Sequence, residues 1–193
     1  MEGCSLGTAI RTRVSSREFS GASIELGDLS TLLHYSNGFR TRNVDGESVT
    51  HRNAPSSGNL GSVEIFPVAL RVSGLRPGIY HYDTAGHFLS VVQRGEFATW
   101  LREYVLYQRE FSKAAVAFVL VGSVGRVTAK YGDRGYRLVL LDVGHVSENL
   151  QLTATAAGLR VCATAGFIDG ELNQALGIDG LASASFLVLL VGT

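Results

Sequence analysis

Hydrophobic and polar positions follow one another along the chain in patterns that predict both helices and strands. Residues 28–35 carry three leucines at helical spacing, and we expect this helix to begin at Asp28 and to end at Asn37 and Gly38. Helical spacing also predicts helices over residues 97–111, 138–159 and 171–176. The second of these is long and largely apolar, with Gly158 as its cap, so we expect it to lie buried in the middle of the fold.

Four stretches have the pattern of β-strands. Residues 114–121 form a continuous apolar run rich in β-branched side chains, which is typical of a central strand buried on both faces. Residues 63–72 are also strand-like, and Pro67 predicts an edge position or a bulge there. The other two stretches are 78–92, with the pattern of a hairpin, and 186–191. Because helices and strands do not alternate strictly, the sequence predicts an α+β fold.

A polar stretch, residues 39–61, separates the first predicted helix from the first strand. It contains several turn signals and almost no large apolar side chains, so we expect a long binding loop. No repeat or low-complexity tract occurs. At 193 residues the chain should form one domain over residues 11–193, preceded by a flexible arm over residues 1–10.

Composition excludes several classes of protein. Seventeen basic and seventeen acidic side chains cancel, so the chain lacks the net positive charge with which proteins bind nucleic acids or anionic membranes. It has no run of about 18 apolar residues and no secretory signal. Its two cysteines, Cys4 and Cys162, form no disulfide framework. We therefore expect a cytoplasmic protein without nucleic-acid or membrane partners.

Three segments offer groups that can bind a ligand. Arg13, Ser15 and Arg17 would point two guanidinium groups and a hydroxyl to one side of an extended chain, where they can bind a phosphate, although a solvated basic arm has the same pattern. Residues 55–59 (PSSGN) offer hydroxyls and an amide, or form a plain turn. Residues 162–167 (CATAGF) have small side chains that allow close approach to the backbone by a ligand or by a neighbouring strand.

Other kinds of site lack a sequence signal. No cluster of His, Cys, Asp or Glu has metal-ligand spacing, so we expect no metal site, and Cys162 is expected to be a small buried side chain. The five histidines are scattered, and His145, within the long predicted helix, is expected in the core. The nucleophile-elbow, Walker and dinucleotide-binding motifs do not occur.

Lys130 and Tyr131 stand out because lysine is rare here: only two of the seventeen basic residues are lysines. A lysine acts as a general base when desolvation or neighbouring cations lower its pKa, and Arg134 and Arg137 follow closely. A basic turn is the alternative interpretation.

Taken in order, five motifs resemble the SagB-type branch of the flavin-dependent nitroreductase superfamily, which includes the azoline oxidases of peptide natural product biosynthesis. The motifs are RVSSR at 13–17, PSSGN at 55–59, GIYHYD at 78–83, KYGDRGYR at 130–137 and CATAGF at 162–167. The resemblance extends from about residue 11 to the end of the sequence. It implies an FMN-binding α+β fold with a central, mostly antiparallel sheet flanked by helices, in an intertwined homodimer that holds the flavin between its subunits.

The resemblance also implies roles for single residues. Arg13, Ser15 and Arg17 would hold the FMN phosphate and ribityl chain, and Lys130 and Tyr131 would form the catalytic pair. The loop that reaches the flavin from the partner subunit would comprise Pro55, Ser56, Ser57 and Asn59. The backbone amides against the flavin ring would be those of Ala163, Thr164, Ala165 and Gly166.

The implied reaction is a two-electron oxidation of a thiazoline or oxazoline to the azole. Lys130 or Tyr131 would remove a carbon-bound proton while hydride passes to flavin N5, and oxygen would reoxidise the flavin. The substrate would be a small molecule, a peptide or a carrier-bound intermediate, and the enzyme could act alone or in a synthetase complex. Two alternatives stay open: an NAD(P)H-dependent nitro or quinone reductase, and a non-catalytic scaffold of the same fold.

One departure from the superfamily bears on the cofactor. Members usually carry a basic residue after the last strand that contacts the phosphate, whereas this sequence ends at Thr193 without one. The departure predicts either weaker FMN binding or a substitute contact from Arg134 or Arg137.

Overall fold

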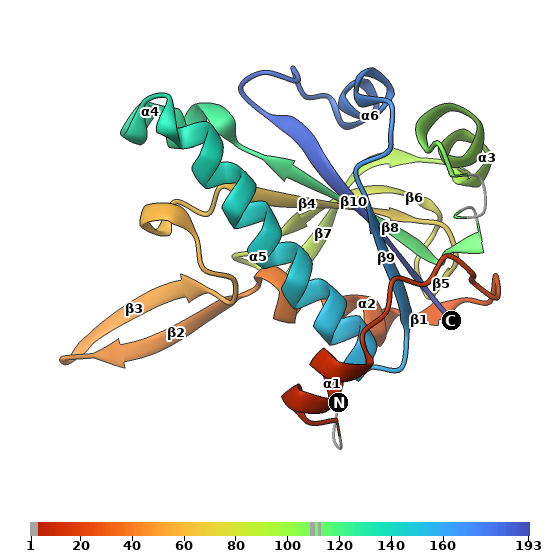
Figure 1. The fold of residues 1–193 in the computed structure, drawn as a ribbon, viewed down its shortest axis with the longest axis horizontal. Coiled ribbons are helices and arrows are strands. Elements are labelled where there is room, and N and C mark those ends of the chain that lie inside the picture. Colours follow the sequence, from red (N-terminus) through yellow and green to blue (C-terminus); the bar gives the residue numbers. More distant parts are fainter. Residues whose placement is uncertain (1–3, 109–110, 112) are drawn as a thin grey trace.

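The computed structural model of the chain describes residues 4–108, 111 and 113–193. A six-stranded sheet forms its centre, and every pair of neighbouring strands in that sheet is antiparallel. Helices flank the sheet (Figure 1), which confirms the predicted α+β fold. The strands, in their order across the sheet, are β7 (Phe88–Arg94), β6 (Gly78–Asp83), β4 (Val63–Ala69), β8 (Val116–Gly122), β10 (Ala184–Gly192) and β9 (Arg160–Thr164).

Two hydrophobic cores lie on the two faces of the sheet. Helices α2 (Leu26–Asn37) and α5 (Arg134–Ala156) contribute to the first core, and α6 (Asp169–Leu176) with the π-helical turn η2 (Leu101–Val105) to the second. Alternate residues of β8 enter different cores, with Phe118 and Leu120 in the first and Val119 and Val121 in the second. This alternation confirms β8 as the central strand buried on both faces, as its apolar run predicts.

The remaining elements are short. They are α1 (Leu6–Thr12), β1 (Ile24–Glu25), β2 (Phe39–Val44), β3 (Glu47–Arg52), the 3-10 turn η1 (Ser57–Asn59), β5 (Val72–Ser73), α3 (Ala98–Trp100) and α4 (Val124–Tyr131). Strand β1 pairs with β5 in a two-stranded parallel sheet, and β2 pairs with β3 in an antiparallel one. Within the described ranges, no helix combines the length and the apolar character that crossing a bilayer requires.

The helix predictions are confirmed in position, with three corrections. Helix α2 begins before Asp28: Glu25 is its N-cap, and the Asp28 carboxylate accepts a hydrogen bond from the Glu25 N–H at 3.2 Å, so the two residues form a capping box. Helix α5 begins four residues before the predicted long helix and ends at Ala156, shortly before Gly158, which takes a positive φ of 73°. It was expected to be buried in the middle of the fold, but it packs on one face of the sheet and leaves its other side exposed. His145 was expected in the core, but it lies on the exposed side of α5.

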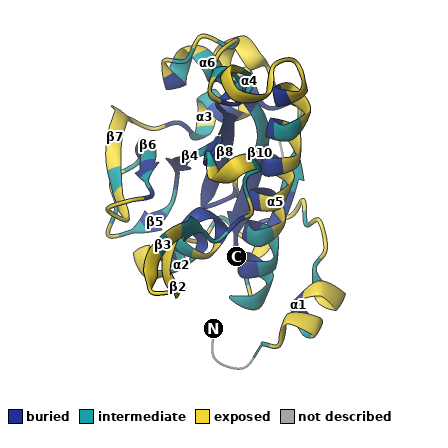
Figure 2. Ribbon diagram, turned by 90° about the vertical axis from the view of Figure 1, so that its left-hand side faces the viewer, coloured by how far each residue is buried: buried dark blue, intermediate teal, exposed yellow. Residues whose placement is uncertain are grey.

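The expected long loop over residues 39–61 is wrong, because most of it forms the β2–β3 hairpin. Asp45 and Gly46 connect the strands with φ angles of 52° and 86°, the conformation that Asp-Gly favours in two-residue hairpin turns. The hairpin projects from the body of the molecule (Figure 1) and is largely exposed (Figure 2). Because none of its described side chains is buried, its strands lack the alternating apolar pattern that predicts strands elsewhere.

Two further predictions need correction. Pro67 lies in β4, which is an internal strand between β6 and β8 rather than an edge strand. The proline is tolerated because β4 pairs with β6 only at Val68 and Ala69, so no ladder bond to β6 is lost at position 67. The helix expected over residues 97–111 extends only through α3 and η2, to Val105, and residues 109 and 110 of that prediction lie outside the described residues.

Candidate functional site

The segment with Arg13, Ser15 and Arg17 lies along the start of β9. Ser15 forms a parallel β-bridge with Val161, and the N–H of Ser16 donates to the Val161 carbonyl at 2.9 Å. Alternate residues of an extended chain point to opposite sides, so the bridge places the three predicted phosphate ligands on one side of the segment. Ser15 and Arg17 are exposed and Arg13 is half-buried, so these groups remain accessible.

Residues 163–166 continue the same strand at its other end. The Thr164 hydroxyl accepts a hydrogen bond from the Gly166 N–H at 3.0 Å, and the Tyr107 N–H donates to the Gly166 carbonyl at 3.3 Å. β9 is the last strand in the sheet order, so beyond the Ser15 bridge no strand of the described chain pairs with its outer edge. Unpaired backbone groups at a sheet edge are available to a ligand. β9 therefore brings residues 13–17 and 163–166 together, and we call these residues the β9 cluster.

Lys130 and Tyr131 lie against the loop of residues 55–59. Gly58 has a φ of 57°, and a Cβ atom at this position would overlap the Tyr131 hydroxyl and lie 2.9 Å from Lys130 Nζ. Lys130 Nζ lies 5.4 Å from the centre of the Tyr131 ring. Both side chains are exposed in the single chain. The structure thus places the predicted catalytic pair beside Pro55, Ser56, Ser57 and Asn59, and we call this group the loop–α4 cluster.

Two glycines fix the position of Lys130 and Tyr131. Helix α4 ends at Gly132, whose φ of 58° and ψ of −148° favour glycine. At the start of α5, Gly135 lies so close to α4 that an added Cβ would be 2.7 Å from the Thr128 Cα. The two helices therefore meet at a tight corner, and Lys130 and Tyr131, in the last turn of α4, lie at that corner.

Asp142 holds the loop in place, and sequence reasoning missed it. This carboxylate, on α5, is only 2% exposed and accepts hydrogen bonds from the Ser57 N–H at 3.0 Å, the Ser57 hydroxyl at 3.0 Å and the Ser62 hydroxyl at 2.6 Å. A buried carboxylate is tolerated only when such donors satisfy it. An aspartate inside the otherwise apolar run LVLLDVG was the signal that could have identified it.

A second polar network lies below the loop, around Glu64 of β4. Arg126 donates to the Gly61 carbonyl at 2.7 Å and to Glu64 at 3.3 Å, and His81 donates to Glu64 at 3.3 Å. Burial by itself raises the pKa of Glu64, but the hydrogen bond from His81 and the charges of Arg52 and Arg126 outweigh burial and hold that pKa below its ordinary value. For the Arg52 guanidinium, burial disfavours the positively charged form and lowers the pKa below its ordinary value.

The β9 cluster and the loop–α4 cluster lie on opposite sides of α5 (Figure 1), so a single chain does not bring them together. Arg134 and Arg137 stand at the start of α5, whose 23 residues span about 33 Å. Residues 13–17 of the β9 cluster lie near the other end of that helix, so these two arginines are remote from Arg13 within one chain, whereas Ala165 lines a hollow together with Tyr136 near the start of the helix. The base beside the Arg13 segment is Arg160, which donates to the Glu18 carbonyl at 3.1 Å and was not predicted.

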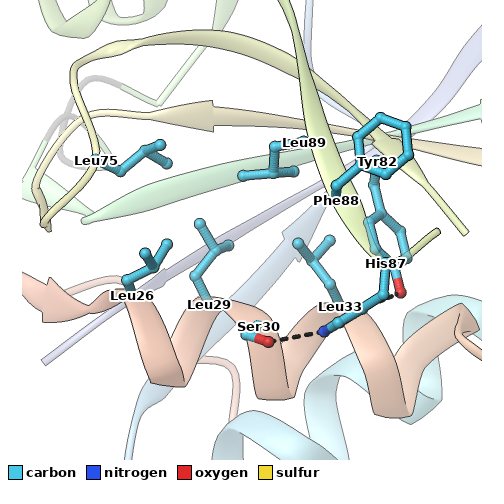
Figure 3. Close-up of a pocket in the computed structure, with 9 residues that line it drawn as sticks. All are labelled: Leu26, Leu29, Ser30, Leu33, Leu75, Tyr82, His87, Phe88 and Leu89. Carbon is cyan, nitrogen blue, oxygen red and sulfur yellow. Dashed lines mark hydrogen bonds between the residues drawn. The ribbon is translucent and has the colours of Figure 1, made fainter.

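A cavity of 290 Å³ lies elsewhere, between α2 and the β6–β7 hairpin (Figure 3). Leucines of α2 face Leu75 and Leu89 across it, and His87 closes one end, with its Nε2 2.8 Å from the Ser30 hydroxyl and its Nδ1 2.8 Å from the Tyr82 hydroxyl. Burial raises the pKa of Tyr82 to about 12. No residue predicted for the site lines this cavity. Among the residues that the structure describes, no three His, Cys, Asp or Glu side chains gather as metal ligands.

Comparison with known proteins places this geometry in a family. The sequence model of the Nitroreductase family matches residues 10–193. A protein of Methanocaldococcus jannaschii and a solved structure from Anabaena variabilis both carry the name putative nitroreductase. The former is 31% identical over 166 residues, which are 86% of this chain and 81% of that protein. The latter is 26% identical, with a TM-score of 0.80, and the match covers 97% of this chain but only 37% of that one.

A third similar structure is a chain of the E. coli microcin synthetase McbBCD complex with truncated pro-MccB17 bound. It has a TM-score of 0.77 and is 23% identical, and the match covers all of this chain and 74% of that one. At this identity the similarity shows the fold alone. The three matches together establish the fold over nearly the whole chain.

Proposed function

The chain belongs to the nitroreductase family and is an oxidoreductase, and we propose that it is an FMN-dependent dehydrogenase of the SagB type that oxidises an azoline to an azole. The observation that carries the proposal is the contact of Lys130 and Tyr131 with Gly58. An ammonium or amine group and a phenol meet there on a loop that, by its resemblance to the branch, faces the flavin.

The β9 cluster fits FMN. Arg13 and Arg17 supply guanidinium forks and Ser15 a hydroxyl, groups that bind phosphate oxygens. The chain continues from β9 into Ala165 and Gly166, which have little or no side chain to keep a flat ring away, while the Gly166 carbonyl accepts a hydrogen bond from the Tyr107 N–H. When bound, FMN would supply the two-electron redox chemistry by accepting a hydride. Arg160 is positioned to add a further positive charge beside the phosphate.

We propose that the active site is completed by a homodimer. The two clusters are separated by α5 within one chain, and the outer side of α5 exposes apolar side chains, with Tyr136, Leu140 and Leu141 at 52%, 43% and 54% exposure. Such a face is typical of a subunit interface. Pairing two copies across this face would bring the loop–α4 cluster of one subunit to the β9 cluster of the partner subunit, as the family resemblance implies.

In this arrangement a residue of the loop–α4 cluster accepts the proton that the substrate loses. Lys130 or Tyr131 takes a proton from one carbon of the azoline ring, and the bonding pair left behind forms the new double bond. The hydrogen of the adjacent ring carbon would leave as a hydride to the cofactor, and the ring becomes aromatic. Closing the dimer over the exposed Lys130 would exclude water from the reacting groups. Asp142 is a positioning residue: through its hydrogen bonds to Ser57 it holds the loop of residues 55–59 against Lys130 and Tyr131.

The test is spectroscopic. The protein is loaded with FMN and mixed anaerobically with a model peptide that contains a thiazoline, while flavin absorbance and the ultraviolet band of the thiazole are recorded. We expect the flavin to bleach as thiazole forms, and Lys130→Ala to abolish both changes while leaving the flavin bound. Lys113→Ala is the matched control, since Lys113 is the other lysine of the chain and lies outside both clusters. Flavin that NADPH bleaches rapidly and the peptide does not would instead identify a reductase.

A further inference from the structure

A basic hollow lies where the β2–β3 hairpin meets the loop of residues 55–59. Its volume is 410 Å³, and its polar lining consists of Arg40, Arg42, His51, Arg52, Ser56 and Asn59. None of the described residues that line it is acidic. In a chain of zero net charge, three guanidinium groups around one hollow are a local excess of positive charge, and His51 adds an imidazole to its lining.

The hairpin register produces this arrangement. Arg40 and His51 are direct cross-strand partners, so their side chains lie on the same face of the hairpin. Arg42 is two residues further along β2 and therefore shares that face. The turn at Asp45 and Gly46 fixes the pairing, so the chain itself holds the three groups together without a ligand.

Glu47, the cross-strand partner of Val44, is the acidic residue that the strand register places on this face. Among the described residues, no carboxylate lies within ion-pair distance of Arg40, Arg42 or His51. Arg52 follows His51 in β3 and therefore lies on the other face of the hairpin, where its guanidinium donates to the Thr84 hydroxyl at 2.8 Å and interacts with the charge of Glu64. Like charges placed close together repel one another, so an anion that enters the hollow gains the attraction of both Arg40 and Arg42.

We propose that this hollow binds a phosphate group of the molecule that exchanges electrons at the adjoining active site. Guanidinium forks match the oxygens of a phosphate, and several of them suit a dianion better than a single carboxylate. The hollow shares Ser56 and Asn59 with the loop–α4 cluster, so a molecule held here by its phosphate extends toward Lys130 and Tyr131. The inference rests on the proposed function, since it assumes that the loop–α4 cluster is the reacting site.

The binding test uses the FMN-loaded protein and inorganic pyrophosphate as the probe, measured by calorimetric titration. We expect saturable binding that the double variant Arg40→Gln/Arg42→Gln weakens at least about tenfold, because charge-assisted hydrogen bonds are lost. Arg76→Gln is the control, since Arg76 is equally exposed but lies outside the hollow. Equal binding by the double variant, or no saturable binding by the wild type, overturns the inference.

A second arm identifies the source of the phosphate. Reduction of the bound flavin by NADPH is compared with reduction by NADH, which lacks the 2′-phosphate. A KM for NADPH that rises about tenfold in the double variant, with the KM for NADH unchanged, assigns the phosphate to an electron donor. If pyrophosphate binds while both dinucleotides behave alike, the phosphate belongs to the substrate that is oxidised.

The flavin absorbance separates the two hypotheses. If the double variant loses FMN, the arginines belong to the cofactor's own site, which overturns this inference but leaves the proposed dehydrogenase intact. If Lys130→Ala retains full turnover while pyrophosphate still binds in an Arg40- and Arg42-dependent manner, the proposed base is wrong and the anion site stands.

Discussion

The carboxylate of Asp142 accepts hydrogen bonds from both the backbone N–H and the hydroxyl of Ser57, a residue 85 positions earlier in the chain. The contact ties the loop of the candidate site to the helix that crosses the sheet. Because the carboxylate is buried, the position of the loop is fixed by the packing of α5 rather than by the loop's own turn preference.

Replacing this carboxylate should destabilise the protein. Asp142→Asn removes the charge and turns one acceptor into an NH₂ group that faces the donors of Ser57 and Ser62, so we expect a loss of about 1–3 kcal/mol in the free energy of unfolding. Urea denaturation of both proteins measures it. Asp133→Asn is the control. Asp133 is the N-cap residue of the same helix, but its side chain makes no capping hydrogen bond. Equal losses in the two variants would contradict the anchoring role.

The Gly58 position allows a test of the loop and the proposed catalytic pair, Lys130 and Tyr131, together. Gly58→Ala forces a Cβ into the Tyr131 hydroxyl and toward Lys130 Nζ, so we expect a fall in turnover of about tenfold or more as the pair is displaced. Gly46→Ala is the control that separates the effect of backbone strain at a positive φ from the effect of the steric overlap with Tyr131. Gly46 also has a positive φ, of 86°, but nothing lies within 4 Å of its added Cβ, so this variant should cost about 1 kcal/mol of stability and no activity.

Elements with a buried face could be predicted from the sequence, and exposed ones could not. The apolar run of β8 and the stripe of α5 carry their periodicity because each packs on a core. The β2–β3 hairpin has no such face, and only the Asp45-Gly46 pair signalled it. Pro67 misled because the sequence does not show how many residues of β4 pair with β6.

The candidate site was predictable residue by residue but not in its arrangement. Lys130 was notable as a rare lysine, yet its contact with Gly58 spans 72 positions and depends on how α4 and α5 meet at Gly135. Nothing in the sequence indicated that α5 separates this pair from Arg13. Long-range packing of this kind leaves no local pattern, which is also why Asp142 was missed.

Removing Arg13 should weaken cofactor binding. Arg13→Ala deletes a guanidinium from the segment that lies alongside β9, so we expect the dissociation constant for FMN to rise about tenfold. Flavin fluorescence, which changes on release, gives the dissociation constant. Arg11→Ala is the control because Arg11 is exposed in α1, before the segment. An unchanged constant for Arg13→Ala would remove this residue from the phosphate site.

Glu64 should make the stability of the protein depend on acid pH. Its pKa is lower in the folded state than the ordinary value of 4.5, so the folded protein binds the proton less readily than the unfolded chain. The stabilisation by the Glu64 carboxylate is therefore complete above pH 4.5 and is lost as the pH falls through the folded pKa. Glu64→Gln, which keeps the size of the side chain, should be less stable than the wild type at pH 7, and the difference should shrink as the pH falls below 4.5. Urea unfolding at a series of pH values measures both curves. A difference that stays constant down to pH 3 would show that the contacts of Glu64 with Arg126 and His81 do not depend on its charge.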